Sequence, residues 1–428
     1  MIIAHLGPGL ARTGGPAGYL WQLRDALAGV EMPHRVLFPD AAAPALKANP
    51  PSMMERVRRR VIRAVTGGPR LYRPPVEELS KRGGQIDRMV RASLADNASA
   101  SEASLAQAMA SNADILFAHD LATASAALDR RTSRQQVWLM QHTPTSTALY
   151  LAWNWGVPEE AWEQVLEFPD VKAWTRHEVE VCERVDRVVL PCREAIDDLA
   201  KCDARFASVL ASADIIRTGA TRALASEGTQ AQQRAKLRLP IDQPVGLFLG
   251  SLQAYRGFDT LVGGLNLLND PVAIPGTVAV AGPDPSTVPV HERIRALGRV
   301  EDVSSLLHAV DFVINVNRFS LFDLSIVEAL EASRPVVLHN SGGNRAFVSM
   351  DAGCITLADL EPKTVAAGLE RGFTMTSGEL AQLGQKSRAC YEANLRPAYL
   401  AARHLALYED ASRTWAKWRG PARLRKNA

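Results

Sequence analysis

Residues 247–265 read LFLGSLQAYRGFDTLVGGL, and this stretch decides the fold. An apolar run at 245–249 predicts a buried strand, Gly250 ends it, and an amphipathic helical pattern occupies 258–265. Glycine lets a backbone approach a bulky anion, Arg256 can hold phosphate oxygens with its planar guanidinium, and a helix N-terminus adds amide donors. The stretch therefore predicts a clamp for a diphosphate. The alternative is a purely structural role, since glycine after a strand is common.

Short runs rich in Val, Ile and Leu alternate with longer helical patterns along the whole chain. This alternation is typical of parallel sheets covered by helices on both faces, so the fold class is α/β. Such doubly wound sheets bind ligands beyond the carboxyl ends of their strands. Strands are expected at 2–6, 35–38, 115–118, 136–140 and 187–190, and again at 245–249, 276–281, 312–316 and 335–338.

The chain of 428 residues is too long for one ordinary core. A polar segment rich in Gln and Ala, at about 220–242, separates the two strand series and is interpreted as a linker. We therefore expect two Rossmann-like, doubly wound domains, 1–217 and 218–396, that face one another across a cleft. Residues 397–428 are expected to form a helix that crosses back to the first domain.

Composition indicates a soluble globular protein, with 47% hydrophobic and 22% charged residues. The net charge of +3 does not call for a nucleic-acid partner. The five cysteines form no CxxC pair, which favours free thiols in a reducing compartment. The N-terminus lacks the pattern of a signal peptide, and no apolar stretch is long enough to cross a membrane. A cytoplasmic location is expected.

Two turns after strands offer backbone groups to a ligand. The sequence VAVAGPDP ends a strand at Gly282, and LGRVEDV carries a turn that includes Arg299 and Val300. The N–H and C=O groups of such loops can meet the edge of a nucleobase, although each pattern alone is also ordinary turn chemistry.

The segment SLFDLSIVEALEASRPVVLHNSGGN, residues 320–344, places a helix N-terminus at the predicted cleft. The first-turn amides at Leu324 and Ser325 suit a diphosphate. Glu328 lies one turn further along, where a carboxylate suits the paired hydroxyls of a ribose. The alternative for Glu328 is a solvated helix face.

With these elements in this order, the chain resembles the retaining glycosyltransferase family 4 of the GT-B superfamily. In that family a strand ends in Gly-Arg, a Lys-Gly pair follows, then a G-x-G-like turn, a Gly-x-Val turn, and two glutamates separated by seven residues before a Pro-Val-Val strand. The run from 250 to 337 carries the most specific part of the resemblance.

The resemblance implies the GT-B fold and transfer of a hexose from a nucleoside diphosphate sugar to a hydroxyl acceptor. The acceptor is a glycan, a lipid-linked molecule or another compound. Retention of anomeric configuration is also implied by the resemblance. No metal or other cofactor is expected, because the chain has no Asp-x-Asp element at a strand end of the kind that holds a divalent ion in the other major transferase fold. The alternatives are a non-catalytic GT-B-like nucleotide-binding or scaffold protein, a nucleotide-sugar epimerase and a phosphorylase.

The chain departs from the family pattern at four positions. Ser251 stands where the family has arginine, and Arg256 replaces lysine and keeps the charge. Ser320 takes the place of the first glutamate, so only the ribose contact, at Glu328, carries over. Asp323 replaces a glycine, and it either supplies a displaced carboxylate or caps the helix, the second being favoured.

In the N-terminal half, His119 and His142 each follow an expected strand. The family has a histidine near the donor sugar at a comparable strand end, and His142 is the candidate. It would donate a hydrogen bond to a sugar hydroxyl or orient the acceptor, and the alternative is a local bond to a loop carbonyl. Gly14 and Gly15 lie where the family brings backbone close to phosphate or acceptor, or serve a tight turn only. The resemblance thus gives His142, Arg256 and Glu328 as candidate catalytic residues.

Two basic clusters complete the candidates. Arginines are dense at 56–63, and tryptophans and basic residues alternate at 415–426. Mixtures of cations with apolar residues can lie on anionic lipid, and a solvated face is the alternative. If the acceptor is lipid-linked, peripheral contact with the inner face of a membrane would follow.

Overall fold

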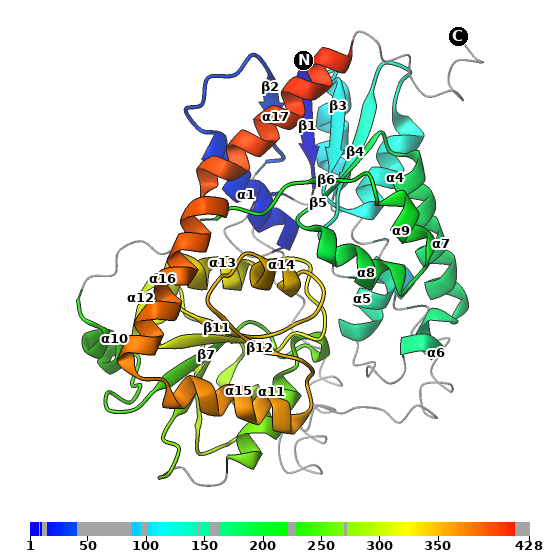
Figure 1. Cartoon of the computed structure of the whole chain (residues 1–428). Coiled ribbons are helices and arrows are strands. Elements are labelled where there is room, and N and C mark those ends of the chain that lie inside the picture. Colours follow the sequence, from blue (N-terminus) through cyan, green and yellow to red (C-terminus); the bar gives the residue numbers. More distant parts are fainter. Residues whose placement is uncertain are drawn as a thin grey trace.

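The computed structural model describes residues 1–7, 9–10, 15–40, 88, 90–93, 95, 101–143, 145–154, 162–220, 228–268 and 272–415. Within them, the strands form two six-stranded sheets in which every pairing is parallel (Figure 1). Helices cover both faces of each sheet, as the predicted α/β class requires.

The first sheet has the order β2-β1-β3-β4-β5-β6. Its strands are β1 (Ile2–Leu6), β2 (Arg35–Leu37), β3 (Ile115–Ala118), β4 (Gln136–Met140), β5 (Arg187–Leu190) and β6 (Asp214–Ile215). Its helices are α1 (Gly15–Leu27), α4 (Leu121–Arg130), α5 (Thr147–Asn154), α6 (Trp162–Leu166), α7 (Pro169–Arg184), η2 (Arg193–Ala195), α8 (Ile196–Ala200) and α9 (Arg205–Val209).

The second sheet has the order β12-β11-β10-β7-β8-β9. Its strands are β7 (Val245–Leu249), β8 (Thr277–Ala281), β9 (Ile294–Gly298), β10 (Phe312–Asn315), β11 (Val336–His339) and β12 (Cys354–Leu357). The helical elements are α10 (Gln230–Lys236), η3 (Ala254–Arg256), α11 (Phe258–Leu267), η4 (Pro285–Thr287), α12 (Val303–Ala309), α13 (Leu324–Glu331), α14 (Asn344–Ser349), α15 (Pro362–Thr374), α16 (Ser377–Asn394) and α17 (Pro397–Trp415).

Each sheet separates two apolar clusters, because successive side chains of a strand point to opposite faces. In β3, Ile115 and Phe117 join the cluster on one face, whereas Leu116 and Ala118 join the cluster on the other, and all four are 0% exposed. A strand buried on both faces must be apolar throughout, which is why the central strands read as continuous runs of Val, Ile, Leu and Phe.

Helix α17 crosses back from the second domain to the first, as predicted. Figure 1 shows it running from the end of α16, which packs on α13, along the first domain beside α1. Leu400 and Tyr408 of α17 share a buried cluster with Ile3 and Phe117 of the first sheet. The helix therefore completes the core of a domain to which it does not belong in sequence. The boundaries at 217 and 396 stay predictions.

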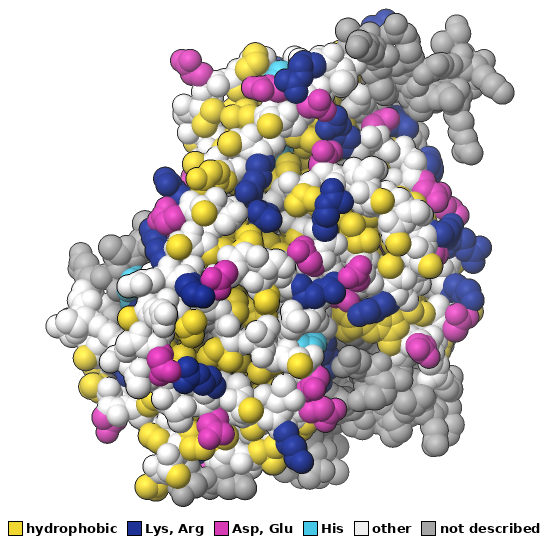
Figure 2. Space-filling model, viewed as in Figure 1, with side chains coloured by type: hydrophobic (Ala, Val, Ile, Leu, Met, Phe, Trp, Pro, Cys, Tyr) yellow, Lys and Arg dark blue, Asp and Glu magenta, His cyan; other side chains and the backbone are white. Residues whose placement is uncertain are grey.

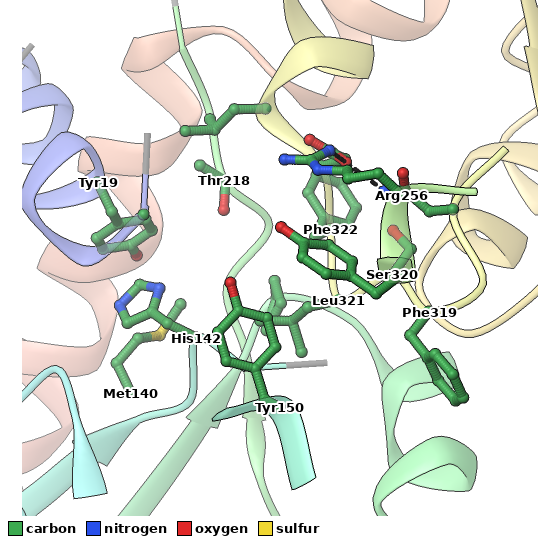
Figure 3. A pocket seen from close by; sticks show the side chains of 16 residues that line it. Tyr19, Met140, His142, Tyr150, Thr218, Arg256, Phe319, Ser320, Leu321 and Phe322 are labelled. Atoms are coloured by element: carbon green, nitrogen blue, oxygen red, sulfur yellow. Dashed lines mark hydrogen bonds and ion pairs between the residues drawn. The ribbon is translucent and has the colours of Figure 1, made fainter. Parts of the chain in front are cut away.

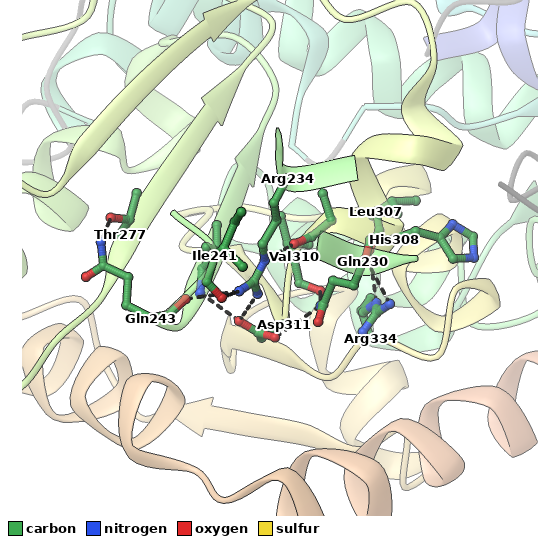
Figure 4. A network of polar contacts seen from close by, with 12 residues as sticks. Gln230, Arg234, Ile241, Gln243, Thr277, Leu307, His308, Val310, Asp311 and Arg334 are labelled. Atoms are coloured by element: carbon green, nitrogen blue, oxygen red, sulfur yellow. Dashed lines mark hydrogen bonds and ion pairs between the residues drawn. The ribbon is translucent and has the colours of Figure 1, made fainter. Parts of the chain in front are cut away.

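The segment at 220–242 is not a plain linker, which corrects the interpretation from sequence. It contains α10, which begins with a capping box between Thr229 and Gln232. Arg234 of this helix donates to the carbonyl of Ala309 and forms a 2.6 Å ion pair with Asp311 (Figure 4). Oδ2 of Asp311 also accepts the N–H of Val245 at 2.7 Å, so α10 is fastened to the end of the second sheet at which the central strands β7 and β10 begin.

Three short edge or near-edge strands, β6, β9 and β12, were not predicted. Some predicted strand ends also move by one residue, as at β8 and β11. On the face drawn in Figure 2, basic and acidic side chains are interspersed, which agrees with the small net charge. In the described part of the chain, no helix has the length and apolar character needed to cross a membrane. The basic clusters at 56–63 and 416–426 lie outside the described residues.

Candidate functional site

A cavity of about 210 Å³ lies between the two domains, and we call it the interdomain cavity. Figure 3 shows Tyr19, Met140 and His142 of the first domain on one side and Arg256 and Ser320 of the second on the other. The complete lining is Gly15, Tyr19, Met140, His142, Tyr150, Pro191, Thr218, Tyr255, Arg256, Asn317, Phe319, Ser320, Leu321, Phe322, Asp323 and Leu324.

Arg256 reaches this cavity because of the glycines around it. Gly257 has φ +67°, and a Cβ there would lie 2.0 Å from the carbonyl oxygen of Val316. Gly250 has φ +143°, and a Cβ there would stand 3.5 Å from Cζ of Arg256, so the guanidinium lies against the end of β7. The sequence therefore needs glycine at both positions to bring Arg256 over the strand end.

Asp323 holds Arg256 in place and caps α13. Nη1 of Arg256 donates to Oδ2 of Asp323 at 2.6 Å, and Asn315 and Asn317 donate to the same oxygen. The other oxygen accepts from Ser325, which is the cap expected from the sequence. Burial alone would raise the pKa of Asp323, but the charge of Arg256 and these hydrogen bonds outweigh it, and the pKa lies below its ordinary value.

Two polar atoms at the rim of the interdomain cavity are buried without a hydrogen-bond partner. They are Nε of Arg256 and Oγ of Ser320. Because an unsatisfied buried polar group costs about 1–3 kcal/mol, such atoms mark a place where a polar ligand has something to bind. Ser320 is the position at which the first family glutamate is missing, and the structure does place it in the cavity wall.

Helix α13 points its N-terminus at the same cavity, with Leu324 in the lining. Glu328 lies one turn inside this helix and is 5% exposed, so the alternative of a solvated helix face is wrong. Glu328 does not belong to the lining of the interdomain cavity. Its contact with a ribose stays a prediction.

A second cavity, of about 860 Å³, opens at the carboxyl ends of β7 and β8, and we call it the C-terminal cavity. Its lining is Gly250, Ser251, Leu252, Phe258, Asp259, Val262, Gly282, Pro283, Thr287 and Pro289. It brings together three residues predicted from sequence, Gly250, Ser251 and Gly282. Arg299 is exposed and Val300 packs on the core beside α12, and neither is in this lining. Gly250 connects the C-terminal cavity to Arg256 and thus to the interdomain cavity.

The first domain contributes a third cavity, of about 290 Å³, which we call the N-terminal cavity. It shares Gly15, His142 and Tyr150 with the interdomain cavity. Nε2 of His142 is hydrogen-bonded to Nδ1 of His119 at 2.9 Å, so the alternative of a bond to a loop carbonyl is wrong. Gly15 begins α1 at φ +76°, and Gly14 lies outside the described residues.

Sequence reasoning missed the residues that brace the site from behind. Asn315 ends β10, Asn317 follows two residues later, and both donate to Asp323. Arg318 forms two 2.9 Å bonds with Asp259. Arg318 also donates to the carbonyl of Ala254 at 2.5 Å and thereby supports the turn that carries Arg256. Their position directly after an apolar strand is the signal that could have found them, since ligands and their supports gather at carboxyl ends of strands.

Residues 243–373 match the family model described as "Glycosyl transferases group 1". This region covers β7 to α15 and includes Arg256, Asp323 and Glu328. No curated protein matches the chain in sequence.

Nearly the whole chain is similar in structure to solved two-domain proteins. Sucrose-phosphate synthase from Thermosynechococcus elongatus is 17% identical with a TM-score of 0.64, over 96% of this chain and 98% of that chain. HepE from Anabaena, solved in complex with UDP-glucose, is 14% identical with a TM-score of 0.61, over 96% of this chain and 100% of that chain. At such identities the likeness shows the fold, two facing Rossmann-like domains. The likeness in structure shows the GT-B fold, and the region 243–373 within it matches the model of glycosyl transferases group 1.

Proposed function

We propose that this enzyme transfers a hexose from a nucleoside diphosphate sugar to a hydroxyl acceptor, with retention of anomeric configuration. The observation that carries the proposal is the position of Arg256. Its guanidinium lies between the strand end that leads to the C-terminal cavity and the N-terminus of α13 in the interdomain cavity. The complex of HepE with UDP-glucose supports the class of donor.

The three cavities suggest an order along the donor and acceptor. The C-terminal cavity is mainly apolar and lies at strand ends, which suits a nucleoside. The diphosphate would lie against Arg256 and the amide end of α13, and the hexose would extend toward His142 in the interdomain cavity. The N-terminal cavity adjoins His142 and Tyr150 and would admit the acceptor.

The chemistry that this arrangement serves is departure of the nucleoside diphosphate. Negative charge grows on the diphosphate as the glycosidic bond breaks. Asp323 takes one side of the guanidinium of Arg256, which leaves its unpaired Nε–H and the amide end of α13 for the leaving group. Donors held in place before reaction stabilise such charge without the cost of reorganising water.

We also propose that transfer needs no metal ion, because Arg256 and the helix terminus supply positive potential where the charge develops. Turnover is expected to continue at an unchanged rate in excess EDTA. A loss of activity that Mg²⁺ or Mn²⁺ restores would contradict this part of the proposal.

Incubation with a panel of nucleoside diphosphate sugars tests the function directly. Release of nucleoside diphosphate that depends on an added hydroxyl acceptor, such as a glycan or a lipid-linked sugar, is the expected result. The configuration of the new bond, read by NMR, tests retention. Binding of nucleotide without turnover would favour a non-catalytic protein. Conversion of the sugar without an acceptor would favour an epimerase, and a reaction that depends on inorganic phosphate would favour a phosphorylase.

Membrane contact is the remaining part of the proposal. If the acceptor is lipid-linked, the basic clusters would hold the enzyme on an anionic surface. Sedimentation with vesicles that contain an anionic lipid is then expected to decrease as salt rises, whereas no binding to such vesicles at low salt would exclude this contact.

A further inference from the structure

Six side chains of the first domain and α17, five of them buried and one, His142, half-buried, form one continuous chain of hydrogen bonds. It begins at His142 in the interdomain cavity and ends at Tyr19, which lines the same cavity. The successive bonds are His142 Nε2 to His119 Nδ1 (2.9 Å), His119 Nε2 to His5 Nδ1 (2.8 Å), His5 Nε2 to Tyr408 Oη (2.8 Å), Tyr408 Oη to His404 Nδ1 (3.1 Å) and His404 Nε2 to Tyr19 Oη (2.8 Å). We call this chain the relay.

The relay draws its members from distant parts of the sequence. His5 lies in β1, His119 and His142 follow β3 and β4, Tyr19 lies in α1, and His404 and Tyr408 lie in α17. The two members from α17 are 0% exposed, and Tyr19 is 2% exposed. The rings of Tyr19 and His142 also meet edge to face, with centroids 5.0 Å apart, so the two ends of the relay touch. Water is therefore kept out of its interior.

All six members are electrically neutral near pH 7. Burial lowers the pKa of each histidine, to about 3 for His142 and His404, and neighbouring histidines lower it further for His5 and His119. Burial likewise raises the pKa of both tyrosines. A neutral histidine carries one ring proton and a tyrosine carries one hydroxyl proton. Each member therefore has one proton to give.

Counting protons leaves two arrangements of the relay in which every inner member donates within it. A third arrangement, in which the hydroxyl of Tyr408 accepts from both His5 and His404, would leave its own proton without a partner in a side chain that is 0% exposed. The five bonds of the relay need one proton each, and the four inner members, His119, His5, Tyr408 and His404, supply one proton each. The fifth proton must come from one end. If Tyr19 gives it, every bond is donated toward His142, and if His142 gives it, every bond is donated toward Tyr19.

The surroundings of Tyr19 select the direction. If His142 were the donor, Tyr19 would accept from His404 and its own hydroxyl proton would need another acceptor. Among the described residues no second partner exists for this hydroxyl, and the side chain is 2% exposed. A buried donor without a partner costs about 1–3 kcal/mol. Donation from Tyr19 toward His142 leaves only the Nδ1–H of His142 outside the relay. His142 is the more exposed of the two ends and lines two cavities, so this donor faces a place where a ligand can accept from it.

We propose that the relay fixes His142 as the tautomer protonated at Nδ1, so that the ring presents a hydrogen-bond donor to the interdomain cavity. Nδ1 has no hydrogen-bond partner among the described residues, and His142 lines both the interdomain and the N-terminal cavity. Its chemical partner is an oxygen of the sugar or of the acceptor. Tyr19, His404 and Tyr408 are positioning residues for this contact, and α17 thereby influences the site.

This assignment also limits what His142 can do. A ring nitrogen that already carries a proton cannot take one from an acceptor hydroxyl, so His142 orients a substrate oxygen and does not act as a general base through Nδ1. The effect on turnover rests on the proposed function, whereas the tautomer itself does not.

The tautomer is measured by NMR on the full chain labelled with ¹⁵N-histidine, without substrate. The expected spectrum has a protonated, pyrrole-type Nδ1 and an unprotonated, pyridine-type Nε2 for His142, identified by the signals that are lost in His142→Gln. A pyridine-type Nδ1 in the unaltered protein would overturn the proposal. This result does not depend on whether any sugar donor has been found.

Two variants interrupt the relay, and a third serves as a matched control that leaves it intact. Tyr408→Phe removes the hydroxyl between His5 and His404, and Tyr19→Phe removes the first donor. In either variant the direction is no longer imposed, and the Nδ1-protonated form of His142 is expected to give way to a mixture. Tyr399→Phe is the control, since Tyr399 lies on α17, is 39% exposed and has no part in the relay. An unchanged tautomer in both variants that interrupt the relay would overturn the proposal.

Kinetics then test the consequence for catalysis. Tyr408→Phe is expected to lower kcat about tenfold with a smaller change in the KM of the donor, because one oriented hydrogen bond to the substrate is lost. Tyr399→Phe should match the unaltered enzyme. If Tyr408→Phe changes the tautomer but not kcat, the positioning role is wrong while the relay stands. If the panel of donors yields no activity at all, only the proposed function fails.

Discussion

At the scale of single residues, the pair of Arg256 and Asp323 supports the fold and places the guanidinium that the proposed chemistry requires. Asp323 is satisfied by five donors in all, two of them from Asn315 and Asn317, so it acts as an anchor and not as a free carboxylate at the sugar. Asp323 therefore holds Arg256 in a fixed position. It does not restore the carboxylate that is missing at Ser320.

Replacement of Arg256 by Ala is expected to lower kcat by about 10²–10³-fold, on the scale of a lost donor to a developing anion. It should also destabilise the protein by about 3 kcal/mol, because Asp323 is left buried without its counter-charge. The double variant Arg256→Gln with Asp323→Asn removes both charges and keeps a residue able to cap α13. It should recover stability in urea unfolding but not turnover. Near-normal kcat in either variant would contradict the role of Arg256.

Gly257 offers a sharper test of how the backbone places Arg256. Both Gly257 and Gly29 have φ near +70°, yet a Cβ meets the carbonyl of Val316 at 2.0 Å in the first case and empty space in the second. Gly29→Ala is expected to cost about 1 kcal/mol, the ordinary strain of a left-handed alanine, whereas Gly257→Ala should cost about 3 kcal/mol or more. Equal unfolding free energies for the two variants would show that the backbone at Gly257 can move away from the carbonyl of Val316 at little cost.

At the scale of elements, α10 fastens the second sheet at the end opposite the site (Figure 4). Arg234 reaches three backbone carbonyls as well as Asp311, and its side chain is 7% exposed. Arg334 donates to two further carbonyls of the same region. These bonds satisfy backbone groups where strands begin, so they support the fold without touching the cavities.

Asp311→Ala is expected to destabilise the protein by about 3–5 kcal/mol, since it leaves the buried charge of Arg234 unpaired. Lys386→Ala breaks the exposed pair with Asp351 and should change stability by less than about 1 kcal/mol. Urea unfolding measures both. At a temperature where Asp311→Ala is folded, its KM for the donor should equal that of the unaltered enzyme. A large change in KM would contradict the view that the contacts of Arg234 and Asp311 support the fold without affecting the site.

The same elements show what can be predicted from sequence. Central strands were found because they are apolar on both faces, whereas β9 and β12 are partly exposed and β6 has two residues, so none of the three gives a continuous apolar run. Gly250, Arg256 and Ser320 were found because they sit at strand or helix ends. The partners of Asp323 and the relay were not predicted. The relay joins residues up to 403 positions apart, and no local sequence pattern indicates such contacts.

At the scale of the whole molecule, direct hydrogen bonds join the two domains. Arg345 of α14 donates to Asp197 and to the carbonyl of Glu194, and the thiol of Cys192 donates to the carbonyl of Leu321. Helix α17 adds a third connection, since it follows α16 of the second domain and completes the core of the first. The packing of α17 and a ligand that contacts both domains therefore affect the same connected structure.

The buried histidines make this structure sensitive to acid. A histidine with a pKa near 6.5 when unfolded and near 3 when folded, as for His404, binds more protons in the unfolded state throughout that range. Stability is then full above about pH 6.5 and falls by about 1.4 kcal/mol per pH unit for each such histidine as pH decreases. Burial raises the pKa of Glu178 to about 7, which has the opposite sign, since its proton is bound in the folded state between its unfolded pKa and 7. The pKa values of His5, His119 and His142 are also lowered, so the combined effect of the histidines on stability exceeds that of the one glutamate.

The free energy of unfolding is therefore expected to fall by roughly 2 kcal/mol or more between pH 6.5 and 5.5, as measured by urea titration in buffers of constant ionic strength. Glu178→Gln keeps an oxygen to accept from Thr147 but cannot bind a proton, so it should steepen the fall. A stability that stays flat or rises over this range would mean that the histidines of the relay are protonated in the folded protein. A protonated histidine donates through both ring nitrogens, so the relay would no longer run in a single direction, and the directional argument for His142 would fail.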